Sequence, residues 1–250
     1  MNEPSSSNEA SITGPVTALV EFQVREETTT PDEWLNVWQS RGQDALDAEP
    51  STTAYEAAVS EDHSHNILIF ERYTDGDTSI KEHIARPSHQ VLNETMAANE
   101  MTKRRVMANV LQDIEHYGWW ARPEQTPTQR DADLRMTVIG TRFPDEANKQ
   151  RYIELTGAHA DYCRTHEPGT LIYSGGLVLQ DAQRGPDLRA GDLVFIAVFA
   201  SEAAAVQHRD DPRHLALQPE LEAIERERVL LQSYRTSGRG YLWSHLGSNE

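Results

Sequence analysis

The sequence predicts an α+β fold made of two βαββαβ repeats on one chain. The pattern His-x3-Pro-x-His occurs twice, as HIARPSH at 83–89 and as HRDDPRH at 208–214. A Glu-Pro block precedes each copy, EPSTTAY at 49–55 and EPGTLIY at 167–173. Blocks that recur in the same order at a near-constant separation indicate a tandem duplication.

Both copies contain the same predicted elements in the same order. Strands are expected at 16–24, 52–60, 66–73 and 105–121 in the first copy, and at 134–143, 170–179, 193–199 and 229–244 in the second. The first helix of each copy is expected at 32–48 and 145–166, between a Pro-Asp-Glu start and a Glu-Pro end. A second helix begins near Thr78 or Ser201 and contains the His-x3-Pro-x-His block.

This order gives a ferredoxin-like unit, an antiparallel sheet with both helices on one face. The other face of each sheet stays apolar, so we expect the two sheets to pack together as an intramolecular pseudo-dimer. The expected domains are 16–120 and 134–246, joined by a polar, proline-containing linker at 121–133. Residues 1–15 are expected to form a disordered tail.

Composition excludes several classes of protein. The chain has 250 residues, with 40 acidic and 23 basic side chains, a net charge of −17. That charge repels nucleic acid and anionic membrane surfaces, so neither is an expected partner. A single cysteine, Cys163, excludes a disulfide framework and a zinc site built from several cysteines. No apolar run approaches a membrane span and the start lacks the features of a secretory signal, so we expect a cytoplasmic protein.

The Glu-Pro-Gly-Thr-x-x-Tyr block, the apolar strand after it and the helix with His-x3-Pro-x-His resemble the dimeric α+β barrel superfamily. The most similar branch is the antibiotic biosynthesis monooxygenase family, here in tandem over about 16–120 and 134–244. The resemblance implies cofactor-independent monooxygenases that oxidise anthrone-like polyketides. It also includes haem-degrading monooxygenases, polyketide cyclases and small isomerases, so it specifies the fold better than the reaction.

The same resemblance suggests candidate catalytic residues. Related polyketide cyclases use the histidine that follows Pro-x, which corresponds to His89 and His214 here. Their tyrosine six residues earlier corresponds to His83 and His208, a departure from the cyclase pattern. The haem-ligating histidine of the haem-degrading branch would fall four residues beyond, on an asparagine and a glutamine, so haem is not expected. No residue spacing suggests a metal site, and we expect no cofactor.

The histidine pairs suit proton transfer, because imidazole titrates near neutral pH. On a continuous helix, His83 and His89 would point about 120° apart, so both could line one cavity without facing the same atom. Packing beside the helix end is the structural alternative for each histidine. Further expected substrate-binding residues are Trp38, Arg72, Tyr73, Tyr152, His159, Tyr162 and Tyr173. An aromatic stripe at helical spacing is also typical of a core, and both interpretations remain open.

One difference between the copies concerns charge. Aligning the apolar strands places Glu71, Arg72 and Tyr73 at the positions of residues 196–198, which are apolar. Charges inside a strand are costly unless they are paired or functional. Either the first strand emerges into solvent there, or one copy keeps a polar pocket.

The leading hypothesis is a tailoring enzyme that acts on a small aromatic or polyketide-like molecule. His89 or His214 would remove a proton, and Tyr162, His159 or Arg72 would orient the phenolate. The carbanion would react directly with O2, without flavin, haem or metal. A cyclase or isomerase that uses the same base without O2 is one alternative, and a non-catalytic ligand-binding barrel is another. A homodimer of pseudo-dimers is an expected assembly.

Overall fold

A computed structural model describes residues 12–122 and 132–244 of the chain. The expected tail and linker fall mainly outside these residues. The first half contains β1 (Val16–Val24), α1 (Pro31–Ala48), β2 (Thr52–Ser60), β3 (Asn66–Tyr73), α2 (Gly76–Ala85), α3 (Pro87–Ala98) and β4 (Thr102–Trp119). The second half contains β5 (Ala132–Arg142), α4 (Glu146–His166), β6 (Thr170–Val178), β7 (Leu193–Phe199), α5 (Glu202–Asp210), α6 (Pro212–Glu222) and β8 (Glu227–Ser237). None of the helices in these ranges is long and apolar enough to cross a membrane.

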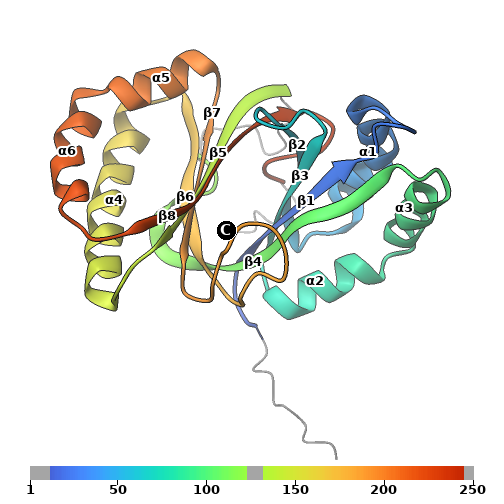
Figure 1. The fold of residues 1–250 in the computed structure, drawn as a ribbon, viewed down its shortest axis with the longest axis horizontal. Helices are drawn as coiled ribbons and strands as arrows, with labels where there is room; N and C mark the ends of the chain where they lie inside the picture. Colours follow the sequence, from blue (N-terminus) through green and yellow to red (C-terminus); the bar gives the residue numbers. More distant parts are fainter. Residues whose placement is uncertain (1–11, 123–131, 245–250) are drawn as a thin grey trace, which may run out of the picture.

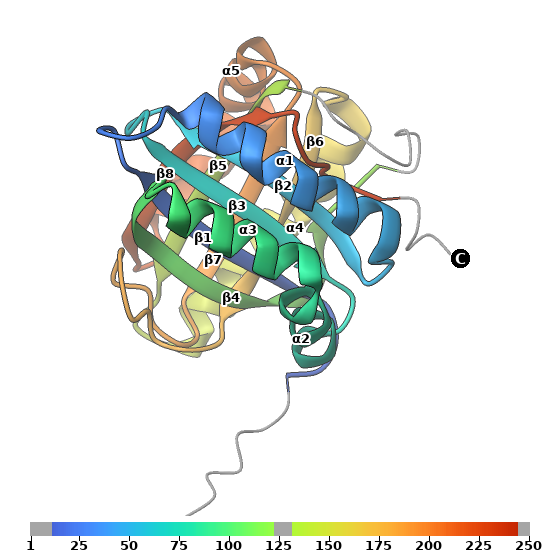
Figure 2. The same ribbon diagram turned by 90° about the vertical axis from the view of Figure 1, so that its right-hand side faces the viewer.

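The strands form one closed barrel in the order β1-β3-β2-β8-β5-β7-β6-β4. Each half contributes four neighbouring strands, and the two halves join where β2 pairs with β8 and where β4 pairs with β6. Helices α1, α2 and α3 cover one side of the barrel, and α4, α5 and α6 cover the opposite side (Figures 1 and 2). The predicted fold class, two ferredoxin-like repeats that form an intramolecular α+β barrel, is confirmed. We call residues 12–122 the first repeat and residues 132–244 the second repeat.

The barrel interior is the main hydrophobic core, and both repeats contribute to it. Leu19 and Phe70 of the first repeat belong to the same buried cluster as Met136 and Ile196 of the second. Alternate residues of each strand point into this core, and the residues between them face the helices. Each repeat therefore presents a second strand surface to its own helices.

The second helix of each repeat is broken in two, which corrects the expectation of one continuous helix. Arg86 and Asp211, the residues before Pro87 and Pro212, have extended backbones with ψ of 140° and 131°. A residue before proline avoids the helical region because the proline ring clashes with it. The chain turns at this point, so the two histidines of each block lie on different helices.

The alignment of the apolar strands β3 and β7 is also corrected, by one residue. Tyr55 of β2 pairs with Glu71, and the equivalent Tyr173 of β6 pairs with Ala197. Glu71 therefore corresponds to Ala197 rather than to Ile196. A shift of one residue moves a side chain to the other face of a sheet. Glu71 faces the helices, and Arg72 faces the barrel interior.

Candidate functional site

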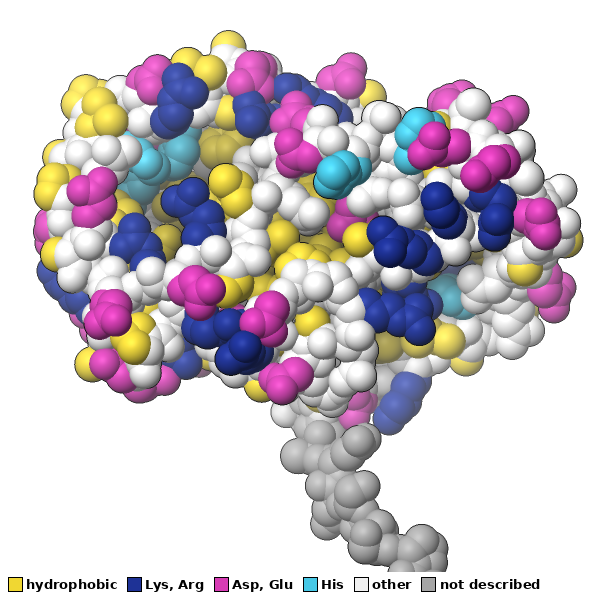
Figure 3. Space-filling model, viewed as in Figure 1, with side chains coloured by type: hydrophobic (Ala, Val, Ile, Leu, Met, Phe, Trp, Pro, Cys, Tyr) yellow, Lys and Arg dark blue, Asp and Glu magenta, His cyan; other side chains and the backbone are white. Residues whose placement is uncertain are grey.

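Each repeat encloses a cavity between its sheet and its own helices. The first cavity measures about 800 Å³ and the second about 340 Å³. Figure 3 shows histidine side chains in a hollow on the side of the molecule that carries α4, α5 and α6. Volumes in this range are typical of sites for small molecules.

Most of the expected site residues line one of these cavities. The first cavity contains Trp38, Tyr73, His83 and His89. The second cavity contains Tyr152, His159, Tyr173, His208 and His214. The structure therefore groups the candidates by repeat and forms two separate sites.

Two expected substrate-binding residues lie elsewhere. Arg72 pairs with Asp113 inside the barrel, and its guanidinium carbon lies 4.0 Å from the centre of the Trp120 ring. The strand does not emerge into solvent at this point, and the charge of Arg72 is paired. Arg72 cannot orient a ligand beside the histidines, because β3 lies between them. Tyr162 is not part of the lining of the second cavity, and its hydroxyl donates to Asp211.

The first cavity contains a buried histidine–carboxylate pair that the sequence pattern does not predict. His83 Nδ1 lies 2.7 Å from Oε2 of Glu49, and both side chains are at most 5% exposed. Thr52 donates to the same carboxylate oxygen at 2.8 Å. Arg41 Nη2 lies 2.5 Å from the other oxygen, Oε1. A carboxylate only accepts hydrogen bonds, so we assign the ring proton of His83 to Nδ1. Nη2 of Arg41, which is a donor, also lies 2.8 Å from this nitrogen.

The second repeat has the same pair. His208 Nδ1 lies 2.7 Å from Oε2 of Glu167, and Thr170 donates to that oxygen at 2.9 Å. The environment differs, because the thiol of Cys163 lies 3.8 Å from His208 Nδ1. The duplication has therefore preserved a Glu–Thr–His group in both repeats and changed the residues around it.

The two glutamates are held in the charged form. Burial alone would raise the pKa of Glu49, but the hydrogen bond and charge of His83 and the charge of Arg41 outweigh burial and lower it. In the same way burial opposes ionisation of Glu167, and its bond to His208 lowers its pKa to about 2. An ionised carboxylate on Nδ1 orients the ring and stabilises the imidazolium that forms when Nε2 accepts a proton.

The second histidine of each block is close to the first. The ring centres of His83 and His89 are 5.4 Å apart, and those of His208 and His214 are 4.7 Å apart. Both pairs are packed edge to face. The helix break brings them together, whereas a continuous helix would have separated them. Burial first, and then the charges of His83 and Arg41, lower the pKa of His89 to about 4. His89 is therefore neutral at physiological pH, and its Nδ1 has no hydrogen-bond partner among the described residues.

The sequence predicts only that Glu49 and Glu167 end helices. Both are the C-cap residues of α1 and α4, as expected, but their side chains turn back to the histidines. The signal was present, because Glu, Thr and Tyr recur at identical positions in the two Glu-Pro blocks. Helix capping explains a change of chain direction, but it does not explain a repeated acidic side chain and threonine.

Comparisons with known proteins agree with the fold. Residues 15–95 match the family model described as antibiotic biosynthesis monooxygenase, which confirms the resemblance for the first repeat. A solved candidate monooxygenase from Lactobacillus acidophilus NCFM has a TM-score of 0.68 at 16% identity, over 91% of this chain and 98% of that one. One from Fusobacterium nucleatum has a TM-score of 0.64 at 13% identity, over 92% and 96%.

An anthrone oxidase-like protein is also similar, with a TM-score of 0.52 at 16% identity over 89% of this chain and 91% of that one. No curated protein matches the sequence significantly. The family match supports a monooxygenase-like function, and the structural similarities support the shared fold.

Proposed function

We propose that the first cavity is the active site of a monooxygenase for a small aromatic or polyketide-like substrate, with His83 as the base. The observation that carries this proposal is the buried pair of His83 Nδ1 and Glu49. The pair leaves Nε2, which lies 3.3 Å from Arg41 Nη2, as the ring atom that exchanges protons. The family match, over residues 15–95, lies within this repeat. His89 or His214 was the expected base, but His89 has no carboxylate partner, and its pKa, lowered to about 4 by burial first, makes it a weak base.

The lining of the first cavity suits a flat aromatic molecule. Trp34, Trp38, Tyr55 and Tyr73 supply aromatic surface. Ile84 also lines the cavity and is 53% exposed, so it offers an apolar entrance. Aromatic walls with a few polar groups are typical of sites that bind such ligands.

The chemistry begins with removal of a proton from a methylene that a ketone or phenol makes acidic. His83 Nε2 accepts the proton, and Glu49 stabilises the resulting imidazolium. The carbanion reacts with O2, and the peroxide then loses water. One oxygen atom remains in the product as a carbonyl, and the other leaves as water.

Oxygen uptake with an anthrone, followed together with quinone formation, tests this function. We expect one O2 consumed for each quinone formed. His83→Asn should lower kcat/KM by about 10² to 10⁴, the usual contribution of a general base. His214→Asn, in the second cavity, should retain wild-type activity. Loss of activity in His214→Asn alone would contradict the assignment to the first repeat.

Two further outcomes separate the alternatives. Product formation that continues without O2 would indicate a cyclase or isomerase on the same fold. Quenching of Trp34 and Trp38 fluorescence by the anthrone reports binding independently of turnover. Tight binding without any turnover would favour a ligand-binding barrel and contradict the proposed enzyme.

A further inference from the structure

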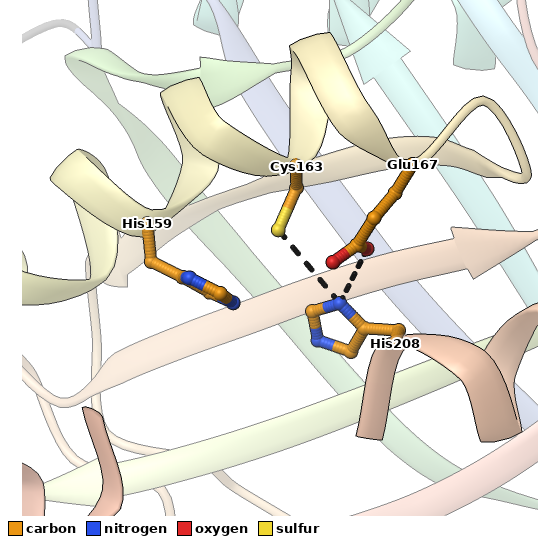
Figure 4. Close-up of side chains that lie close together, drawn as sticks. All are labelled: His159, Cys163, Glu167 and His208. Atoms are coloured by element: carbon orange, nitrogen blue, oxygen red, sulfur yellow. Dashed lines mark hydrogen bonds and ion pairs between the residues drawn. The ribbon is translucent and has the colours of Figure 1, made fainter. Parts of the chain in front are cut away.

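Four side chains with metal-binding atoms converge in the second repeat (Figure 4). His159, Cys163 and Glu167 follow one another at intervals of four residues along one face of α4 and its C-cap, and His208 approaches from α5. One ligand atom from each residue can be chosen so that all four lie within 4.8 Å of one another. All four residues are buried, with exposed fractions of at most 8%.

Part of this group has no hydrogen-bond partner. His159 is only 3% exposed, and neither of its ring nitrogens is bonded to any described residue. The Oε1 atom of Glu167 is likewise buried without a partner. Leaving a buried polar group unpaired costs about 1–3 kcal/mol, so such groups usually have a hydrogen-bond partner or bind an ion. Both residues point toward the sulfur of Cys163 and the ring of His208.

The first repeat shows which group neutralises the charge of Glu49, the residue equivalent to Glu167. Arg41 and Ala45 of α1 correspond to His159 and Cys163 of α4, because each lies 118 residues earlier, as Glu49 does relative to Glu167. The guanidinium of Arg41 supplies a positive charge 2.5 Å from Glu49. In the second repeat a neutral imidazole and a thiol replace the arginine and the alanine.

We propose that a divalent transition-metal ion, zinc in the first place, binds between His159, Cys163, Glu167 and His208. The ion would supply the positive charge that Arg41 supplies in the first repeat. One thiolate, two imidazoles and one carboxylate form a donor set that suits zinc. Tetrahedral zinc needs ligand atoms about 3.3–3.7 Å apart. The 2.7 Å between His208 Nδ1 and Glu167 Oε2 must therefore lengthen by less than about 1 Å, and ligand atoms that lie up to 4.8 Å apart must approach by about 1 Å.

Binding of the metal ion displaces protons from its ligands. The thiol proton of Cys163 and the proton between His208 and Glu167 leave as the ion enters. Four protein ligands fill a tetrahedral coordination sphere, which is typical of a structural site. The ion therefore joins α4 to α5 at the wall of the second cavity, and the proposed chemistry remains in the first.

Titration of the chelator-treated full chain with Zn²⁺ and Co²⁺ tests this site. We expect one ion per chain, a rise in Tm with Zn²⁺, and a sulfur-to-cobalt charge-transfer band with Co²⁺. Cys163→Ala, which copies Ala45, should abolish that band and weaken Zn²⁺ binding at least tenfold. His159→Arg, which copies Arg41, should remove binding altogether.

His116→Ala is the control, because His116 is a 90% exposed histidine beside Glu115. It should leave the stoichiometry, the cobalt band and the Tm shift unchanged. Circular dichroism and the Tm without metal verify that each variant folds. Absence of the cobalt band in the wild type, or an equal band in folded Cys163→Ala, would overturn the proposal. Loss of binding in His116→Ala would instead assign the metal to the surface and also overturn it.

Discussion

The Nδ1 atom of His83 lies 2.7 Å from Oε2 of Glu49. The pair is buried between α1, α2 and the sheet, and it recurs as His208 and Glu167 in the second repeat. The residue beside the pair differs, arginine in one repeat and histidine in the other. The duplicated fold therefore retains one acid–histidine unit in two different electrostatic environments.

Removing the charge of Arg41 should destabilise the first repeat. Its side chain is fully buried against Glu49, and in Arg41→Met that glutamate would keep only the half-buried Arg86, 3.3 Å from Oε1, as a cationic neighbour. Breaking a buried pair from one side costs about 3–5 kcal/mol. Urea unfolding should show a loss of this order. Arg209→Met breaks an exposed pair with Asp210 and should cost less than about 1 kcal/mol. Equal losses in the two variants would contradict the role assigned to burial.

Arg105 should assist the binding of acidic aromatic ligands. It lines the first cavity, whereas its neighbour Arg104 bonds Gln23 and is not part of the lining. Arg105→Gln should raise the Kd for a phenolate about tenfold, and Arg104→Gln should leave it unchanged. Fluorescence titration of both variants with a neutral and an ionised analogue measures the effect. A tenfold change with the neutral analogue would show that charge is not the cause.

His89 should titrate far below a free histidine. Its pKa is lowered to about 4 by burial and then by the charges of His83 and Arg41, and the reference value is 6.5. Between these values the unfolded chain binds a proton that the folded chain does not. The free energy of unfolding should therefore decrease as pH falls from 6.5 toward 4.

NMR titration of the ring, assigned with His89→Asn, measures the midpoint. The pH dependence of unfolding should also be shallower in His89→Asn. A midpoint near 6.5 would contradict the buried environment that the structure gives this ring.

The pairing of β4 with β6, one of the two junctions between the repeats, should depend on Gly118. Its φ is +69°, and a Cβ there would lie 1.8 Å from the carbonyl oxygen of Tyr173. Gly118→Ala should therefore cost at least about 2 kcal/mol of unfolding free energy. Gly157→Ala, in α4, meets no atom closer than 3.7 Å and should stabilise the chain by up to about 1 kcal/mol. If Gly118→Ala is as stable as wild type, the close approach of Gly118 to the carbonyl of Tyr173 is not present.

The fold followed from the repeated blocks, because duplicated elements must bury the same faces. Two details of the fold did not follow from these blocks. The strand register was wrong by one residue because an apolar run carries no alternation to fix which face is inside. The helix break at Pro87 and Pro212 was missed, although proline restricts the residue before it.

The histidines were found because imidazole is rare and was repeated. Glu49 could not be identified as a site residue in this way, because its position at a helix end already had a structural explanation. The grouping of His208 with His159 was not predictable from spacing, because α4 and α5 meet only through the folded sheet. Arg72 was placed in the site because its charge was conspicuous, but the strand turns it into the barrel.

The most direct test of the central claim is proton abstraction itself, measured without oxygen. An anthrone incubated anaerobically in D2O with the protein should exchange its acidic methylene hydrogen at a rate that depends on His83. We expect exchange in the wild type and in His214→Asn, and a loss of about 10² or more in His83→Asn and in Glu49→Gln. Exchange at the wild-type rate in folded His83→Asn would contradict the assignment of His83 as the base.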